Sequence, residues 1–81
     1  MKVRVRVFAL ARQVAGCDAV EIELAEGATV AGLRRELAAR LPQLSGLVRH
    51  LTFAIDAQYV ADDAVVLPGS EVACIPPVSG G

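Results

Sequence analysis

The chain has few of the side chains on which most enzymes and nucleic-acid-binding proteins depend. Its 81 residues include one histidine, two cysteines and no tryptophan, and the aromatic residues are Phe8, Phe53 and Tyr59. So small an aromatic set does not supply the stacking platforms that bind single-stranded nucleic acid. A net charge of −1 provides no strong field that would attract nucleic acid or anionic lipid. These shortages argue against nucleic-acid binding and membrane-surface binding.

Motifs for catalysis and for metal binding are missing as well. The sequence contains no glycine-rich phosphate loop, no HExxH sequence and no cysteine–histidine cluster. Cys17 and Cys74 form no ligand pattern, and Cys74 falls in an apparent strand, where it is expected to be a small core residue. The lone His50 is expected on the surface. Asp62 and Asp63, adjacent in a polar bend, are expected to be solvated.

Length and hydropathy predict one small globular domain. The composition is 54% hydrophobic and 21% charged, and 81 residues leave little room for a buried cleft. The first residues alternate charge with valine instead of forming a secretory apolar run. No stretch approaches the roughly 18 apolar residues of a membrane span. We therefore expect a cytoplasmic protein without a disulfide.

Alternation of polar and apolar residues predicts strands at both ends of the chain. The alternation is strict in 2–7 and 20–24, which are expected to pair as a hairpin. Asp56-Ala57 and Pro68-Gly69 are predicted turns. The five predicted strands are 2–7, 20–24, 52–55, 58–60 and 71–75.

One helix is predicted between the second and third strands. Thr29 is its expected N-cap, because a threonine hydroxyl can accept a hydrogen bond from a free N–H of the first turn. Pro42 is expected to end it. Residues 11–19 are predicted as a loop with a helical turn, and 43–51 as another short turn. The apolar stripe of the helix consists of Val30, Leu33, Leu37 and Leu41, and Arg34, Arg35 and Arg40 are expected on its surface.

The order β-β-α-β-β-β predicts an α+β domain, a mixed sheet with one main helix packed on one face. The last strand is expected to lie beside the first, in parallel. We assign 1–76 to this domain and 77–81 to a flexible tail.

The end of the chain, Pro76-Pro77-Val78-Ser79-Gly80-Gly81, is its most distinctive segment. Prolines end a strand and stiffen the exit. Two glycines have almost no bulk and wide backbone freedom, so they can thread a narrow channel. The group at the tip is the Gly81 carboxylate, which becomes a good acyl donor only when another enzyme activates it.

Pleat parity predicts an apolar patch where this tail begins. If Val3, Val5 and Val7 face the helix, then Phe8 faces the opposite side. Ile75 joins it there if Cys74 faces the core. We predict that Phe8, Ile75 and the adjoining Pro76 bind a partner protein, because exposed apolar patches often mark docking surfaces.

The chain resembles the MoaD family, the small subunits of molybdopterin synthase among the ubiquitin-like sulfur carriers. The similarity spans essentially the whole chain, and the Pro-Pro-Val-Ser-Gly-Gly ending is its specific part. Family members often carry phenylalanine where this chain has Ile75, and Asn-Gly where it has Asp56-Ala57. The other matching segments are Phe8-Ala9, Glu26-Gly27-Ala28-Thr29-Val30 and Pro68-Gly69-Ser70-Glu71-Val72-Ala73.

The resemblance implies a β-grasp fold and a role as a sulfur carrier. A MoeB-like activating enzyme would use ATP to adenylate Gly81, and a sulfur donor would convert it to a thiocarboxylate. Pro77, Val78, Ser79 and Gly80 would thread into a MoaE-like large subunit, in an expected heterotetramer. Sulfur would there pass to cyclic pyranopterin monophosphate. The chain alone would be non-catalytic and bind no cofactor, since the catalytic pocket belongs to the large subunit.

Three alternatives remain open at this point. The first is a sulfur carrier of thiamine or cysteine biosynthesis. The second is a ubiquitin-like modifier of protein lysines, and the third is an interaction domain with an inert tail.

Overall fold

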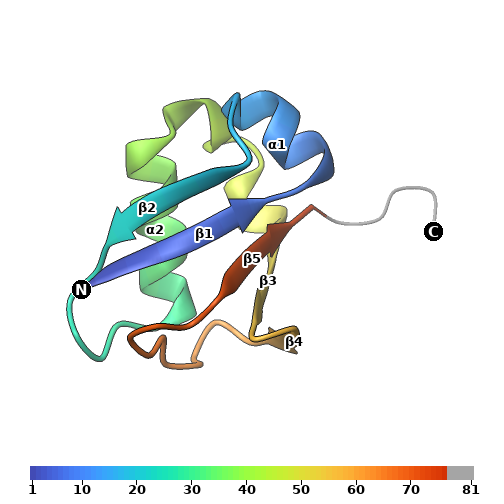
Figure 1. Cartoon of the computed structure of the whole chain (residues 1–81). Helices are drawn as coiled ribbons and strands as arrows, with labels where there is room; N and C mark the ends of the chain where they lie inside the picture. The colour runs from blue at the N-terminus through green and yellow to red at the C-terminus, as the bar shows by residue number, and fades with distance from the viewer. Residues whose placement is uncertain (77–81) are drawn as a thin grey trace.

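The computed structural model describes residues 1–76, in which a five-stranded mixed sheet has helices on one face and none on the other (Figure 1). The order across the sheet is β2-β1-β5-β3-β4, with β1 and β5 parallel and the other neighbours antiparallel. This is the β-grasp arrangement, and the predicted parallel pairing of the first and last strands is confirmed. The elements are β1 (Lys2–Val7), α1 (Ala9–Ala15), β2 (Ala19–Glu23), α2 (Val30–Arg40), the 3-10 turns η1 (Pro42–Leu44) and η2 (Val48–His50), β3 (Thr52–Ile55), β4 (Gln58–Val60) and β5 (Val72–Ile75).

The core lies between the sheet and α2, as the sequence patterns predict. The strand β1 alternates exposed and buried residues along its whole length. Thr29 caps α2, because its hydroxyl accepts a hydrogen bond from the Gly32 N–H at 3.4 Å. Leu41, half-buried, is the C-cap just before Pro42. The buried residues of this layer include Val3, Val5, Val7, Val30, Leu33, Leu37, Phe53, Val72 and Cys74. None of the helices in residues 1–76 is long and apolar enough to cross a membrane.

The helix α1 occupies most of the segment predicted as a loop. It buries Ala11 and Ala15, four residues apart, while Leu10 and Val14 remain exposed. Gly16 ends it in a left-handed conformation (φ 79°), with its N–H bonded to the Arg12 carbonyl at 3.0 Å. The hydrophobic pattern does not predict α1, because the buried side chains of this helix are small and its larger apolar side chains are exposed.

Arg34 is not the surface side chain predicted from the helix pattern. Only 18% of its side chain is exposed, and its guanidinium lies 5.0 Å from the centre of the Phe53 ring. It donates hydrogen bonds to the carbonyls of Val48 (2.6 Å) and Leu51 (2.7 Å) and to the Asp62 carboxylate (2.6 Å). Asp62, predicted to be solvated, is 54% exposed and also pairs with Arg34. Arg34 thus ties α2 to both ends of η2 and to the bend at residue 62.

The β3–β4 connection has backbone geometry that glycine would suit better than alanine. Asp56 and Ala57 both have positive φ (50° and 68°), as two-residue turns of type I′ require. Asp56 is further held by its carboxylate, which accepts a hydrogen bond from the Glu71 N–H at 3.0 Å. Ala57 lies in the left-handed region without such compensation among the hydrogen bonds of residues 1–76.

We expect Ala57→Gly to stabilise the domain by about 0.5–1 kcal/mol, because relief of the left-handed alanine outweighs the added unfolded-state entropy. The midpoint of urea unfolding measures the change. Gly69→Ala is the reciprocal control: Gly69 has φ of +80° and open space around its Cβ position, so it should lose about 1 kcal/mol. Equal and unchanged midpoints for both variants would contradict the prediction.

Candidate functional site at the end of strand β5

The strand β5 holds the base of the C-terminal segment at the centre of the sheet. It lies between β1 and β3, with Val7 opposite Cys74 and Thr52 opposite Ile75. One further bond, from the Phe8 N–H to the Cys74 carbonyl (3.2 Å), continues the pairing past the end of β1. Strands on both sides thus hold the chain up to Ile75, and Pro76 follows directly. In Figure 1 the end of β5 lies beside the start of α1, at the opposite end of the sheet from the N-terminus.

The predicted tail residues lie outside the described part of the chain. Residues Pro77, Val78, Ser79, Gly80 and Gly81 belong to the segment 77–81, so their predicted roles remain predictions. Pro76 is described and half-buried. The structure therefore defines where this segment starts.

The structure places Phe8 and Ile75 on the same open face of the sheet, as pleat parity predicts. Val72 and Cys74 are buried against the helices, so the intervening Ala73 and Ile75 face the other way. Phe8 is 38% exposed, and its ring lies 5.4 Å below the guanidinium carbon of Arg6. We call Phe8, Ile75 and Pro76 the exit patch.

Tyr59 extends the open apolar surface and was not predicted as a site residue. It lies opposite Ala54, which in turn lies opposite Ala73, so these three residues cross β4, β3 and β5 in one row. Tyr59 is 72% exposed and the flanking alanines are small. The type I′ turn at 56–57 sets this register, and that turn was the available sequence signal.

Cys74 is close to the exit patch but is not a usable nucleophile. The side chain is fully buried, and burial raises the pKa of its thiol to about 11, against a smaller opposing effect of Arg34. With this pKa, Cys74 stays a neutral thiol at physiological pH. It is therefore a poor nucleophile, because the reactive form of cysteine is the thiolate. This agrees with the prediction of a small core residue.

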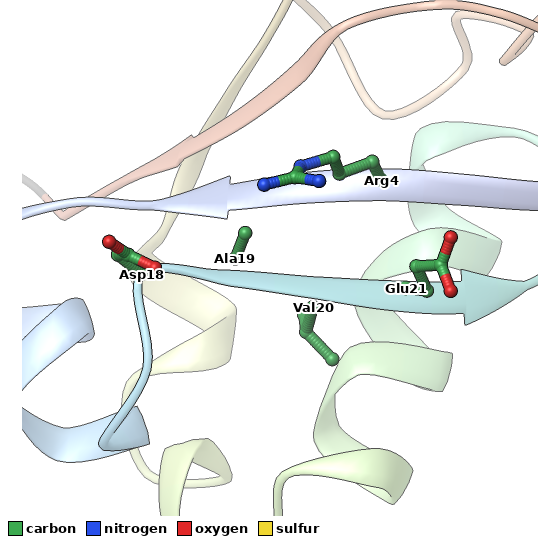
Figure 2. A pocket seen from close by; sticks show the side chains of 5 residues that line it. All are labelled: Arg4, Asp18, Ala19, Val20 and Glu21. Carbon is green, nitrogen blue, oxygen red and sulfur yellow. The ribbon is translucent and has the colours of Figure 1, made fainter.

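A shallow surface depression of about 320 Å³ lies on the β1–β2 side of the sheet. Figure 2 shows Arg4 of β1 above β2, between the carboxylates of Asp18 and Glu21, with Ala19 beneath. His50 lies elsewhere, exposed in η2. Within 1–76 no group of histidine, cysteine and carboxylate side chains could hold a metal ion. The exit patch and the Gly81 terminus remain the candidate site.

Comparison with known proteins identifies the family of the chain. The model of the ThiS family matches residues 5–81. The molybdopterin synthase sulfur carrier subunit of Chlamydomonas reinhardtii is 37% identical, and the match covers 100% of both chains. Among solved structures, SAMP1 from Haloferax volcanii superposes with a TM-score of 0.87 at 27% identity, over 100% of both chains. A molybdopterin converting factor subunit 1 from Pyrococcus furiosus gives 0.84 at 35% identity, over 96% of this chain and 99% of that one.

The family match covers nearly the whole sequence, from the second half of β1 to Gly81, and the full-length relative from Chlamydomonas reinhardtii is 37% identical to it. The β-grasp fold and the Gly-Gly ending agree with that assignment. The chain belongs to the ThiS family and is similar over its full length to the molybdopterin synthase sulfur carrier subunits.

Proposed function

We propose that the chain is the sulfur carrier subunit of a molybdopterin synthase and delivers sulfur as a thiocarboxylate on Gly81. The observation that carries the proposal is the central position of β5, which fixes the start of the Pro-Pro-Val-Ser-Gly-Gly segment beside the exit patch. The full-length relative named above supports it, because that protein is named a sulfur carrier subunit of the same enzyme.

The chemistry follows from the poor reactivity of a carboxylate. An oxygen of the Gly81 carboxylate attacks the α-phosphorus of ATP on a separate activating enzyme, and pyrophosphate leaves. A sulfur nucleophile then displaces AMP from the acyl-adenylate, which leaves a thiocarboxylate. Its sulfur attacks a carbon of the pterin precursor and displaces an oxygen substituent from it. Water then cleaves the bond between the Gly81 acyl carbon and the sulfur, which returns the carboxylate and leaves the sulfur on the pterin. The domain contributes a covalently attached nucleophile and the partner contributes the pocket.

The proposal requires two protein partners. A MoeB-like enzyme adenylates the terminus, and a MoaE-like large subunit receives residues 77–81, in a heterotetramer around a large-subunit dimer. An extended run of five residues reaches about 17 Å. That length carries the Gly81 sulfur well below the surface of a partner docked on the exit patch.

Intact mass spectrometry tests the proposal directly. The chain, incubated with ATP, a MoeB-like enzyme and a sulfur donor, is expected to gain the mass difference between sulfur and oxygen. Addition of the large subunit and the pterin precursor is expected to return the original mass and form molybdopterin. No mass change with an activating enzyme that loads a known carrier would overturn the proposal.

Phe8→Asp is expected to weaken binding of the large subunit by about 100-fold, because a buried interfacial ring is replaced by a charge that must be desolvated. The domain should still fold, since Phe8 is 38% exposed. Leu67→Asp is the matched control. Leu67 is 62% exposed and precedes the first residue of β5, whereas the exit patch lies at the last residue of that strand. A calorimetric titration in which the two variants bind equally well would contradict the role of the exit patch.

A ubiquitin-like protein modifier is the second candidate function. The close superposition on SAMP1 of Haloferax volcanii favours it, because SAMP1 abbreviates small archaeal modifier protein 1, as in the related protein of Methanosarcina acetivorans. Conjugates of higher mass on denaturing gels, formed through an isopeptide bond from Gly81, would identify this function. The sulfur-for-oxygen mass change alone would not distinguish the two functions, so the molybdopterin readout decides.

A further inference from the structure

Three cations of β1 project onto the open face of the sheet, and two of them face carboxylates across the β1–β2 pair. Lys2 is opposite Glu23 and Arg4 is opposite Glu21. Arg6 differs, because its neighbour on β2 is Ala19 and its neighbour on β5 is Ala73. None of these three cations makes an ion pair within residues 1–76, and Arg6 is the one that has no carboxylate in a facing position. The glutamates of β2 therefore lie opposite Lys2 and Arg4, and the charge of Arg6 has no opposite charge facing it.

The side chain of Arg6 is directed toward the exit patch. Its guanidinium carbon lies 5.4 Å from the centre of the Phe8 ring, within the range of a cation–π contact. Stacking of this kind leaves the N–H groups at the edge of the guanidinium available for hydrogen bonds. Phe8 also bonds through its N–H to Cys74 of β5, so the stacked pair borders the start of the tail.

The side chains beside Arg6 are small and apolar. Ala73 and the nearly buried Ala54 (6% exposed) lie in the same row, which ends at the exposed Tyr59, and Ile75 lies one position along on the same face. A partner that covers the exit patch also removes Arg6 from water, because its guanidinium lies over the Phe8 ring. Burial of an unpaired guanidinium is costly, whereas a carboxylate that accepts two of its N–H groups compensates the loss of hydration.

We propose that Arg6 is the ionic anchor of the docking face and binds an aspartate or glutamate carboxylate of the large subunit beside the exit patch. This inference rests on the proposed function, since it names the chemistry of the same partner. A carboxylate is the occupant that fits, because the site offers one planar cation above alanines and next to a ring. Arg4 is the less suitable cation, because Glu21 lies opposite it and the Asp18 carboxylate lies on its other side (Figure 2).

Titration calorimetry of the 81-residue chain with its purified large subunit tests the anchor. Arg6→Gln is expected to weaken binding about tenfold or more, as close interfacial charge pairs do. Arg4→Gln, the matched control on the same strand and face, should change the Kd by less than about twofold. The parent Kd should rise between about 0.05 M and 0.5 M salt, and Arg6→Gln should lose most of that rise.

A charge exchange identifies the partner group. Arg6→Glu is expected to bind more weakly than Arg6→Gln and to recover when one acidic residue of the large subunit is changed to lysine. Thermal unfolding of each variant verifies that the domain still folds. Equal losses for Arg6→Gln and Arg4→Gln, or no loss for either, would overturn the anchor while leaving the sulfur-carrier function intact. Failure of the parent chain to bind would instead overturn both.

Discussion

A chain that ends at Gly80 is expected to lose sulfur loading and molybdopterin synthesis by a factor of at least about 100. Removal of Gly81 moves the carboxylate back by one residue, about 3.5 Å. A reacting group displaced by even about 1 Å can lose a factor of 100 in rate. A chain with one extra residue after Gly81 should fail equally, because its terminal carboxylate lies beyond the position at which the activating enzyme attacks.

Intact mass after activation and the yield of molybdopterin measure this effect. Gly46→Ala is the control, because Gly46 is exposed and an added Cβ there meets nothing within 4 Å. That variant should load sulfur like the parent. Full cofactor synthesis by either altered terminus would contradict the thiocarboxylate mechanism. It would also contradict the proposal that residues 77–81 deliver the sulfur.

Arg34→Ala is expected to destabilise the domain by about 2–4 kcal/mol, because it removes three short hydrogen bonds made by a charged and largely buried group. The carbonyl of Leu51 then loses its guanidinium partner next to the core, and the link between α2 and η2 is broken. Because small domains are only marginally stable, such a loss would be a large fraction of the total. Equilibrium unfolding in urea measures it.

Neighbouring substitutions separate the role of Arg34 from general effects of charge or helix propensity. Arg35, the next residue on α2, is exposed, and Arg35→Ala should change stability by no more than about 0.5 kcal/mol. Asp62→Ala should cost less than about 1 kcal/mol, because its carboxylate is 54% exposed and well screened. Similar losses for Arg34→Ala and Arg35→Ala would show that the buried hydrogen bonds contribute little.

Much of the fold, and the face of the sheet on which Phe8 and Ile75 lie, were predictable because they depend on local patterns. Alternating valines predicted β1, the Thr29 cap and the leucine stripe predicted α2, and parity predicted that Phe8 and Ile75 share a face. The helix α1 was not predicted, since its buried face consists of Ala11 and Ala15, which carry too little hydrophobic signal.

The sequence by itself determined the strands, the main helix and the chemistry available at the Gly-Gly end, because period-2 and helical patterns and terminal residue types are properties of neighbouring residues. Only the tertiary structure decided that Arg34 is buried, that Tyr59 joins the open apolar row and that Arg6 lacks a facing carboxylate. Each of these depends on which strand or turn lies beside the residue. Such contacts between distant segments are set by register and packing, and local hydropathy does not encode them.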